Sequence, residues 1–539
     1  MTDIILIQPP IRDFYLTRKR TIPYGLASIA AVLIKDGFQV EIFDALACSK
    51  TKNIALPEEM AYLRKHYCGL DISPFGLFYH YKHFGYSFQH IARIAQLSGA
   101  FMVGISSLFT AYFDTALKTA QAVKKTCPES KIVFGGHHPT AFPGQVMENS
   151  AVDFVLRGEG EVSISLLAKA LKTDKVFKSI PGIVYRKADK QLFTAQPALM
   201  EDLNKYPPPA LNLIKNRYYQ RSGKDSMVIT ASRGCPLNCS YCSMGSNSIN
   251  KFRMKKISTL SHEIKVAKQG LNLGLIDFED ENLAMNKKWF LALLADIRRQ
   301  FSKHNPELRA MNGLFPPALD QEIIAQMSAS GFKTLNLSLG SASLNQIRRF
   351  KRPDVRAAFD SALNIGRKFN LNSVGYIIAG APHQTPEDSV ADLIYLAKRK
   401  VLAGISIFYP SPGSQDFQTC GNLKILPSFF SLMRSTALPI SHSTSRIESI
   451  TILRLGRILN FIKQLINLKI DLPGQAVSRS ILDPAAGRLH NGRLLLSWFF
   501  QDARIRGLTP DGQVFEYLQA PEIIKQFIRG IKKIQLRGC

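Results

Sequence analysis

The residues with the most specific chemistry are three cysteines set close together in RGCPLNCSYCSM, residues 233–244. Cys235, Cys239 and Cys242 have the spacing Cys-x₃-Cys-x₂-Cys and directly follow an apolar run at 227–231. Thiolates at this spacing suit an iron–sulfur cluster, whereas a structural zinc site takes four ligands, usually as two spaced pairs. Three ligands leave one iron of a cubane open to a small molecule. The alternatives are a zinc site with a remote fourth ligand and a loop without metal.

The other five cysteines are scattered singly: Cys48, Cys68, Cys127, Cys420 and Cys539. This pattern favours reduced cytosolic thiols with one metal loop over a secreted disulfide scaffold. The first residues, MTDIILIQPP, lack a basic stretch followed by a long apolar one, so we expect no signal peptide. No apolar run reaches the roughly 18 residues of a membrane span. We therefore expect a cytoplasmic protein.

Length and charge set wider limits. The chain has 539 residues, 46% of them hydrophobic and 20% charged, which predicts two to four globular domains. Its formal net charge of +28 suits an anionic partner such as RNA, an anionic lipid surface or a phosphate-bearing substrate. A basic but merely soluble surface explains the same number. No single block of Lys and Arg decides between these possibilities.

Residues 1–185 read as alternating strands and helices. The apolar runs expected as strands lie at 4–7, 40–43, 101–105, 132–134 and 152–155. Such strands separated by helices predict an α/β fold, a doubly wound domain whose parallel sheet is covered on both faces. An aromatic-rich insertion at 49–90 interrupts the pattern, and the proline-rich segment 186–220 is expected to be a linker.

The alternation restarts over residues 221–420. Candidate strands lie at 227–231, 273–278, 308–312, 334–339, 373–379 and 404–409. Six βα units predict a partial (β/α)₆ barrel, with its chemistry on the loops that follow the strands. The cysteine loop follows the first of these strands, which is the right end for such a site.

Residues 421–539 lose the alternation and are expected to be mainly helical, with helices at 447–470 and 521–536. The second of these is amphipathic and basic. Such a helix can lie on an anionic membrane surface, but the same pattern is more common in a helix packed on its own domain. We expect packing.

The cysteine loop resembles the signature of the radical S-adenosylmethionine (SAM) superfamily, CxxxCxxC with an aromatic residue before the last cysteine. Here Tyr241 precedes Cys242, and the resemblance covers residues 225–410. It implies that Cys235, Cys239 and Cys242 hold a [4Fe–4S] cluster whose open iron chelates SAM. Reductive cleavage of SAM then gives a 5′-deoxyadenosyl radical. Tyr241 and Met244 would lie against the adenine.

The resemblance implies further SAM contacts on later strands. They are Glu281 in the acidic segment that closes the second strand, Ser338 in the fourth strand and Ile377 in the fifth. The polar residues among them are equally suited to capping helices. One departure concerns the fourth strand, which often continues into Glu-Ser-Gly but here reads Gly340-Ser341-Ala342. The polar wall on that side is therefore open to question.

The N-terminal domain resembles the cobalamin-binding domain that precedes many such barrels. The matching pieces are Pro23–Leu26, Val103–Ser107, Gly135–Thr140 and Arg157–Glu161. Ligands of doubly wound sheets bind outside the carboxyl ends of the strands, and glycines there let the backbone approach a bulky ligand. The resemblance implies a set of cobalamin contacts at those ends: Ser106, Thr110, Gly135, Gly136, His138, Gly158 and Glu159.

The DxHxxG loop that gives cobalt a histidine in other cobalamin proteins is absent, because residues 8–12 read QPPIR. We expect cobalamin without a histidine ligand from this loop, and we expect His138 to contact the loop or the nucleotide tail. The alternative is a domain that has lost the cofactor and serves only as packing.

Together these features predict a cobalamin-dependent radical SAM enzyme, most plausibly a C-methyltransferase. One alternative is an RNA-modifying methylthiotransferase, whose second cluster would need Cys48, Cys68 and Cys127. Others are a radical cyclase or oxidase, and a cobalamin-responsive binding protein without activity. The expected partners are a small-molecule substrate and an external electron donor of the flavodoxin or ferredoxin type. Nucleic acid and a membrane surface are the alternative partners.

Overall fold

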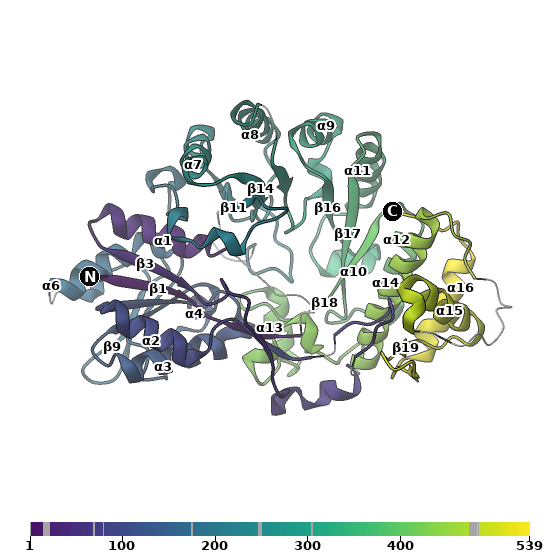
Figure 1. The fold of residues 1–539 in the computed structure, drawn as a ribbon, viewed down its shortest axis with the longest axis horizontal. Helices are drawn as coiled ribbons and strands as arrows, with labels where there is room; N and C mark the ends of the chain where they lie inside the picture. Colours follow the sequence, from purple (N-terminus) through teal and green to yellow (C-terminus); the bar gives the residue numbers. More distant parts are fainter. Residues whose placement is uncertain are drawn as a thin grey trace.

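Parallel strands and helices alternate through the N-terminal third of the chain (Figure 1). The computed structural model describes residues 2–14, 22–67, 70–78, 80–173, 176–245, 251–302, 305–473, 482 and 484–539. In the described part, the main N-terminal sheet has the order β10-β9-β8-β7-β6-β1-β3. Its parallel strands are β1 (Ile4–Gln8), β3 (Val40–Asp44), β6 (Met102–Ser106), β7 (Lys131–Gly135) and β8 (Phe154–Leu156). This confirms the doubly wound fold.

The sheet ends in an antiparallel hairpin that the sequence did not reveal. Strand β9 (Ile183–Arg186) runs antiparallel to β8 and pairs with β10 (Leu192–Thr194). The sheet therefore reaches into the segment expected to be a linker from residue 186. Short connections suffice for antiparallel strands, so the hairpin needs no helix between its strands.

Both faces of this sheet are covered because each strand buries alternate side chains on opposite faces. From β1, Ile5 and Ile7 pack with α2 (Phe88–Ser98) and α3 (Phe113–Thr126). Ile4 and Leu6 pack on the other face, with α1 (Tyr24–Lys35) and α6 (Ile164–Thr173). Each such side chain contributes about 1.5–3 kcal/mol of burial energy. The strand carboxyl ends point away from the N-terminus, toward the middle of the molecule (Figure 1).

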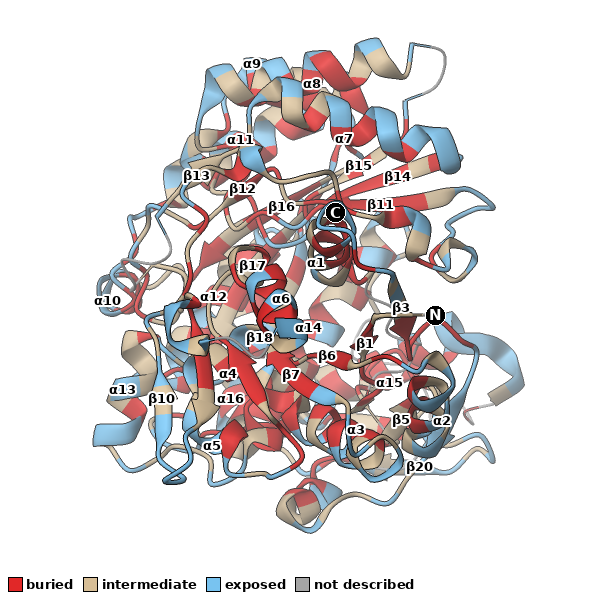
Figure 2. Ribbon diagram, turned by 90° about the vertical axis from the view of Figure 1, so that its left-hand side faces the viewer, coloured by how far each residue is buried: buried red, intermediate tan, exposed pale blue. Residues whose placement is uncertain are grey.

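The second α/β unit is a partial barrel made of two parallel sheets. One contains β11 (Asp225–Ile229), β14 (Leu273–Phe278) and β15 (Glu307–Arg309), and the other β16 (Thr334–Gly340), β17 (Asn372–Ala379) and β18 (Leu402–Ile407). Isolated bridges, such as Leu314 with Leu337, connect the two sheets. The outer layer comprises α7 (Ile257–Gly270), α8 (Lys287–Gln300), α9 (Gln321–Ser330), α11 (Arg356–Lys368) and α12 (Pro386–Ala397). Buried residues follow the strands (Figure 2). The predicted partial barrel is confirmed.

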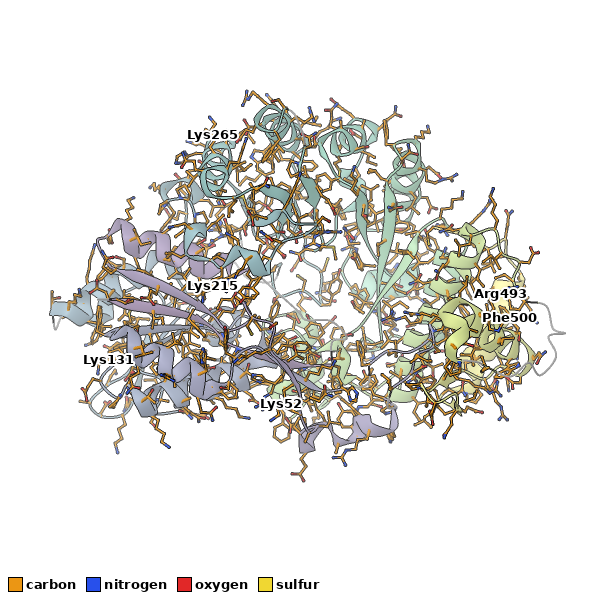
Figure 3. The ribbon with its side chains drawn as sticks, in the orientation of Figure 1. Lys52, Lys131, Lys215, Lys265, Arg493 and Phe500 are labelled. Atoms are coloured by element: carbon orange, nitrogen blue, oxygen red, sulfur yellow. The ribbon has the colours of Figure 1, made fainter. Side chains whose placement is uncertain are left out.

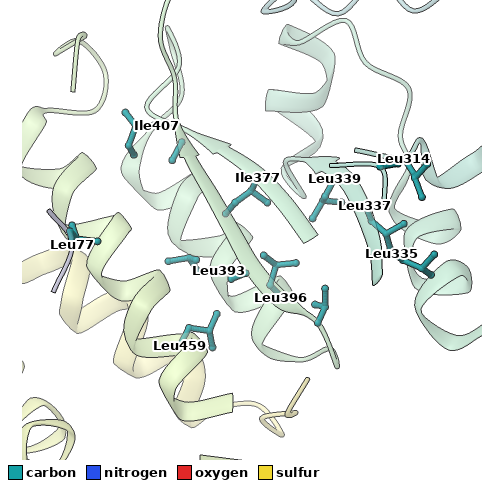
Figure 4. Close-up of a cluster of buried hydrophobic side chains, with 14 of the residues drawn as sticks. Leu77, Leu314, Leu335, Leu337, Leu339, Ile377, Leu393, Leu396, Ile407 and Leu459 are labelled. Carbon is teal, nitrogen blue, oxygen red and sulfur yellow. The ribbon is translucent and has the colours of Figure 1, made fainter. Parts of the chain in front are cut away.

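Helices of the C-terminal region close the free edge of this barrel. Helix α14 (Arg446–Asn467) packs so closely on β18 that a Cβ on Gly456 would lie 1.9 Å from the Cδ1 of Ile405. Figure 4 shows Ile377, Leu393 and Leu459 in one cluster where β17, α12 and α14 meet. The remaining elements are α15 (Gly487–Asp502), the hairpin β19 (Arg506–Leu508) with β20 (Val514–Glu516), and α16 (Pro521–Lys532). The region is thus mainly helical.

The amphipathic C-terminal helix is packed, as expected. The apolar face of α16 is buried against α12 and α14, and its buried residues are Ile523, Ile524, Phe527, Ile528 and Ile531. None of the described helices is long and apolar enough to cross a membrane.

The aromatic-rich insertion packs against both the N-terminal domain and the C-terminal region. Strands β4 (Thr51–Asn53) and β5 (Lys82–Phe84) form a small sheet with β2 (Ile11–Asp13). The Tyr67 hydroxyl donates to the carbonyl of Thr436 at 2.5 Å, and the Asp71 carboxylate accepts from the backbone N–H of Leu508 at 3.1 Å. These contacts bind the insertion to the C-terminal region, so the two segments pack as one unit.

Candidate functional site

A short antiparallel pair of strands lies at the base of the cysteine loop. Strand β12 (Ser232–Arg233) pairs with β13 (Arg253–Met254), so the loop begins and ends at the same place on the barrel. We call this pair the neck of the loop. The buried carboxylate of Asp280, just after β14, accepts hydrogen bonds from the backbone N–H of Ala231 and from the Ser232 hydroxyl, at 3.2 and 2.5 Å. This ties the start of the loop to the carboxyl end of the barrel.

Each thiol of the loop has a nitrogen donor beside it. Asn282 Nδ2 lies 3.8 Å from the Sγ of Cys235, the Met244 backbone N–H lies 3.4 Å from that of Cys242, and Arg352 Nη1 lies 3.7 Å from that of Cys239. Cys239 is buried, and the other two are partly exposed. Burial, together with the neighbouring thiols, raises the pKa values of Cys235 and Cys242. Hydrogen bonds to sulfur stabilise thiolate ligands and tune cluster potentials.

The surroundings of these thiols fit a cluster with a cationic ligand. Within the described residues, no three His, Cys, Asp or Glu side chains converge on a single ion. The thiolates of a cubane need not do so, because each binds a different iron. Beside Cys235, Glu281 Oε2 and Asn282 Oδ1 are buried acceptors without a hydrogen-bond donor. Unpaired buried acceptors are rare in proteins, and the amino group of a bound SAM would satisfy them.

Arg352, which the sequence did not reveal as a site residue, lies beside Cys239 and Tyr241. The Arg352 guanidinium is buried and donates to the Ser338 carbonyl at 2.6 Å, the Ser338 hydroxyl at 2.9 Å and the Tyr241 hydroxyl at 3.1 Å. Gly340 makes room for it, because a Cβ there would lie 3.2 Å from Arg352 Cδ at a φ of +80°. The departure from Glu-Ser-Gly at this strand end signalled that the polar wall here differs, but it did not point to Arg352.

The remaining predicted SAM contacts fall into two groups. Tyr241 lies edge-on to Phe350 with ring centroids 4.9 Å apart, and its hydroxyl, like Ser338, contacts Arg352. Met244 follows Cys242 directly on the loop. Ile377 is different, because its side chain is 1% exposed in the hydrophobic core. Any contact of Ile377 with SAM would therefore have to use its backbone.

The predicted cobalamin contacts lie at the carboxyl edge of the N-terminal sheet. Ser106 ends β6 in register with Gly135, which ends β7. Gly136 has a φ of +123°, and a Cβ there would lie 2.6 Å from the Ser107 carbonyl oxygen. At Gly158 a Cβ would lie 2.2 Å from the Ala198 carbonyl oxygen. Both glycines let the chain's own backbone pack closely at this edge, which shapes the loops around the site.

His138 is packed within the protein rather than presented at the edge. Its Nδ1 lies 3.4 Å from the Thr110 hydroxyl, so two predicted contacts pair with each other. Its ring is 4.2 Å from that of Phe113 and 4.7 Å from that of Phe430. Burial lowers the pKa of His138 to about 3, so the imidazole is neutral.

The same edge shows features that fit a large ligand with apolar faces. Leu108 and Phe109, just after β6, are 42% and 48% exposed. Neighbouring exposed apolar side chains mark binding surfaces. A corrin ring lying against this edge would cover these two apolar side chains.

The two candidate cofactor edges face each other. Arg233, at the neck of the cysteine loop, contacts Glu159 at 3.1 Å and Glu161 at 2.6 Å, both just after β8. The ring centroids of Phe142, from the N-terminal domain, and Phe417, from α13 (Gln415–Asn422), are 6.0 Å apart. Glu159, predicted as a cobalamin contact, has both carboxylate oxygens engaged by arginines from the barrel.

Of the cysteines required for a second cluster, the two that the structure describes lie far apart. Cys48 follows β3 and is therefore at the carboxyl edge of the sheet, where its thiol contacts the Ala45 carbonyl. Cys127 ends α3 and precedes β7, at the opposite edge. Cys68 lies outside the described residues. The two described thiols are thus separated by the length of the sheet.

Comparison with known proteins agrees with this geometry. The family model for the B12 binding domain matches residues 17–168, and that for the radical SAM superfamily matches residues 229–394. An uncharacterized methyltransferase of Pyrococcus horikoshii is 25% identical over 61% of this chain and 71% of its own length. The cytidylyl-2-hydroxyethylphosphonate methyltransferase of Streptomyces wedmorensis is 22% identical over 77% of this chain and 81% of its own.

Solved structures share the fold. OxsB, a cobalamin-dependent SAM radical enzyme solved with aqua-cobalamin and SAM, matches with a TM-score of 0.63 at 12% identity, over 99% of this chain and 79% of that one. TsrM, a radical SAM methyltransferase from Kitasatospora setae solved with cobalamin and a [4Fe–4S] cluster, gives 0.57 at 16% identity, over 78% and 75%.

Fold and domains thus define a radical SAM enzyme with an N-terminal cobalamin-binding domain. The chain belongs to the cobalamin-dependent class of the radical SAM superfamily. Its cofactors are a [4Fe–4S] cluster, SAM and cobalamin.

Proposed function

We propose that the protein is a methyltransferase that adds a methyl group to a carbon atom of a small molecule. The observation that carries this proposal is the contact between the carboxyl edge of the cobalamin-binding sheet and the neck of the cysteine loop, through Arg233. The methyltransferases among its relatives support the same reaction. Magnesium-protoporphyrin IX monomethyl ester cyclases are also among them, so a cyclase is the second candidate.

In this proposal the cysteine loop holds the cluster through Cys235, Cys239 and Cys242. When bound, the cofactors supply a carbon-centred radical and a methyl group. The protein's part is to bind and orient them. Arg352 places a fixed positive charge beside Cys239 and Tyr241, where it favours added negative charge on the cluster. Glu281 supplies an unpaired acceptor for the amino group of SAM.

We propose that the substrate binds to polar groups inside the barrel. Phe278 packs outward near Phe332, so its neighbour Asp277 points to the interior, where it pairs with Arg309. Asp277 Oδ1 and Arg309 Nε are buried and have no hydrogen-bond partner in the described chain. A donor and an acceptor of this kind would fix the orientation of a polar small molecule.

We further propose a cytoplasmic protein that takes electrons from a flavodoxin or ferredoxin type donor, since a +28 chain attracts acidic proteins. Figure 3 shows Lys131, Lys265 and Arg493 on well-separated parts of the molecule. The separation of Cys48 from Cys127 weakens the RNA methylthiotransferase alternative. The buried apolar face of α16 weakens membrane association.

The test is anaerobic reconstitution of the full chain with iron, sulfide and hydroxocobalamin. We expect about four irons, as for a single [4Fe–4S] cluster, and one tightly bound cobalamin per chain. About eight irons would revive the methylthiotransferase. A cluster without any cobalamin binding would leave a radical enzyme that does not transfer methyl groups by this route.

A further inference from the structure

The neck of the cysteine loop concentrates positive charge. Arg233 on β12 and Arg253 on β13 are directly opposite each other in the antiparallel pair, and Lys255 follows two residues later. Like charges in directly opposite positions destabilise such a pair. The neck therefore needs carboxylates from elsewhere in the fold to close.

The cobalamin-binding domain supplies them. Glu159 Oε1 accepts from Arg233 Nη1 at 3.1 Å and from Arg253 Nη2 at 3.0 Å, while its Oε2 accepts from Arg253 Nη1 at 2.9 Å. Glu161 Oε1 accepts from Arg233 Nη2 at 2.6 Å. Burial alone would raise the pKa of Glu161, but the Arg233 guanidinium holds it below its usual value, so the carboxylate is ionised. One glutamate thus bridges the two arginines that would otherwise repel each other.

A second contact joins the cobalamin-binding domain to residues that follow the neck. The hydroxyl of Tyr24, the first residue of α1, donates to Glu263 Oε1 at 3.1 Å and accepts from Lys255 Nζ at 3.0 Å. Lys255 and Glu263 are 2.7 Å apart. Both segments, which resemble pieces of a cobalamin-binding domain, therefore also contact the barrel.

We infer that Glu159 and Glu161 are positioning residues that couple the cobalamin site to the cluster site. They lie one and three residues after Gly158, in the segment that follows β8 at the edge proposed for cobalamin, and they close the neck of the loop proposed to hold the cluster. Binding at either site therefore changes the binding affinity at the other. This inference rests on the cofactor sites of the proposed function.

Coupling between two binding sites is reciprocal and is commonly about 5–150-fold in affinity. It can be measured as the Kd of hydroxocobalamin for the full chain with a reconstituted cluster and for the chain in which Cys235, Cys239 and Cys242 are replaced by Ala. We expect at least about fivefold tighter binding when the cluster is present. The Glu159→Gln/Glu161→Gln variant keeps side-chain size but removes the charge. In this background, the Kd of hydroxocobalamin should be the same with the cluster and with the three cysteines replaced by Ala.

Asp360→Asn is the matched control, because it removes the carboxylate of an ion pair with Arg399 on the outer helical layer of the barrel. It should leave the coupling intact. If the double variant does not fold, Arg253→Lys keeps the charge but loses the two-pronged contact with Glu159, and it should reduce the coupling.

Two results would overturn the inference. Equal hydroxocobalamin affinities with and without the cluster in the unaltered chain, or undiminished coupling in the glutamine variant, would refute the coupling alone. Absence of any hydroxocobalamin binding by the unaltered chain would refute the proposed cobalamin site as well, so the two failures are distinguishable.

Discussion

Asp280 should make the start of the cysteine loop sensitive to pH. Its side chain is buried, and burial raises its pKa to about 7, although donors from Ala231 and Ser232 favour the anion. In the unfolded chain an aspartate titrates near 4. Between these values only the folded protein keeps the proton, so the contribution of Asp280 to stability is complete below about pH 4. It is lost by pH 7, at about 1.4 kcal/mol per pH unit and about 4 kcal/mol in total.

The assay compares chemical unfolding of the cofactor-free chain and of Asp280→Asn at pH 5 and pH 8. The side-chain NH₂ of asparagine cannot accept from the Ala231 N–H, which destabilises the variant by an amount that does not depend on pH. The difference in unfolding free energy between the two proteins should shrink by about 3 kcal/mol from pH 5 to pH 8. Infrared spectra should show a protonated carboxyl at pH 5 that Asp280→Asn lacks. An equal difference at both pH values would refute the reasoning.

Three further predictions concern the cluster wall, the cobalamin edge and the C-terminal packing. Arg352→Gln removes a cation beside a cysteine sulfur, so the midpoint potential in a redox titration should become more negative; a higher potential would contradict the assigned contact. Gly136→Ala forces a Cβ to 2.6 Å from a carbonyl oxygen at positive φ, a strain of about 1–3 kcal/mol, and should weaken hydroxocobalamin binding about 5–150-fold; Gly144→Ala, with nothing within 4 Å, should not. Phe527→Ala should cost about 3–5 kcal/mol in thermal unfolding, since Phe527 is fully buried, whereas the exposed Lys525→Ala should be neutral.

The layers of the fold could be predicted because they follow from local patterns. Continuous apolar runs such as Ile4–Ile7 are typical of strands covered on both faces, and the helical periodicity between them indicates crossover connections. The position of the cysteine loop after the first barrel strand followed from the same alternation.

Elements whose pattern depends on distant partners could not be predicted. Strand β10 (Leu192–Thr194) exists because β9 offers it an edge. Helix α15 buries the consecutive residues Leu494, Leu495 and Leu496, so it shows no single apolar stripe. A helix surrounded by protein lacks the amphipathic signal on which prediction depends.

Only part of the candidate site could be predicted, because its other residues are distant in sequence from the cysteines. Its cysteines are local in sequence, and their spacing was sufficient to locate the loop. Arg352 is more than 100 residues from Cys239, and its approach depends on Gly340 at the end of β16. Glu159 has a motif typical of the cobalamin edge, but only the packing of the two domains reveals its arginine partners.

The central claim is that Cys235, Cys239 and Cys242 hold a cluster that cleaves SAM. The most direct test is quantification of 5′-deoxyadenosine after the anaerobically reconstituted full chain is incubated with SAM and dithionite. We predict its formation by the unaltered chain and none by the chain with the three cysteines replaced by Ala. Equal formation by both proteins, or none from an unaltered chain that carries a full complement of iron and sulfide, would contradict the account.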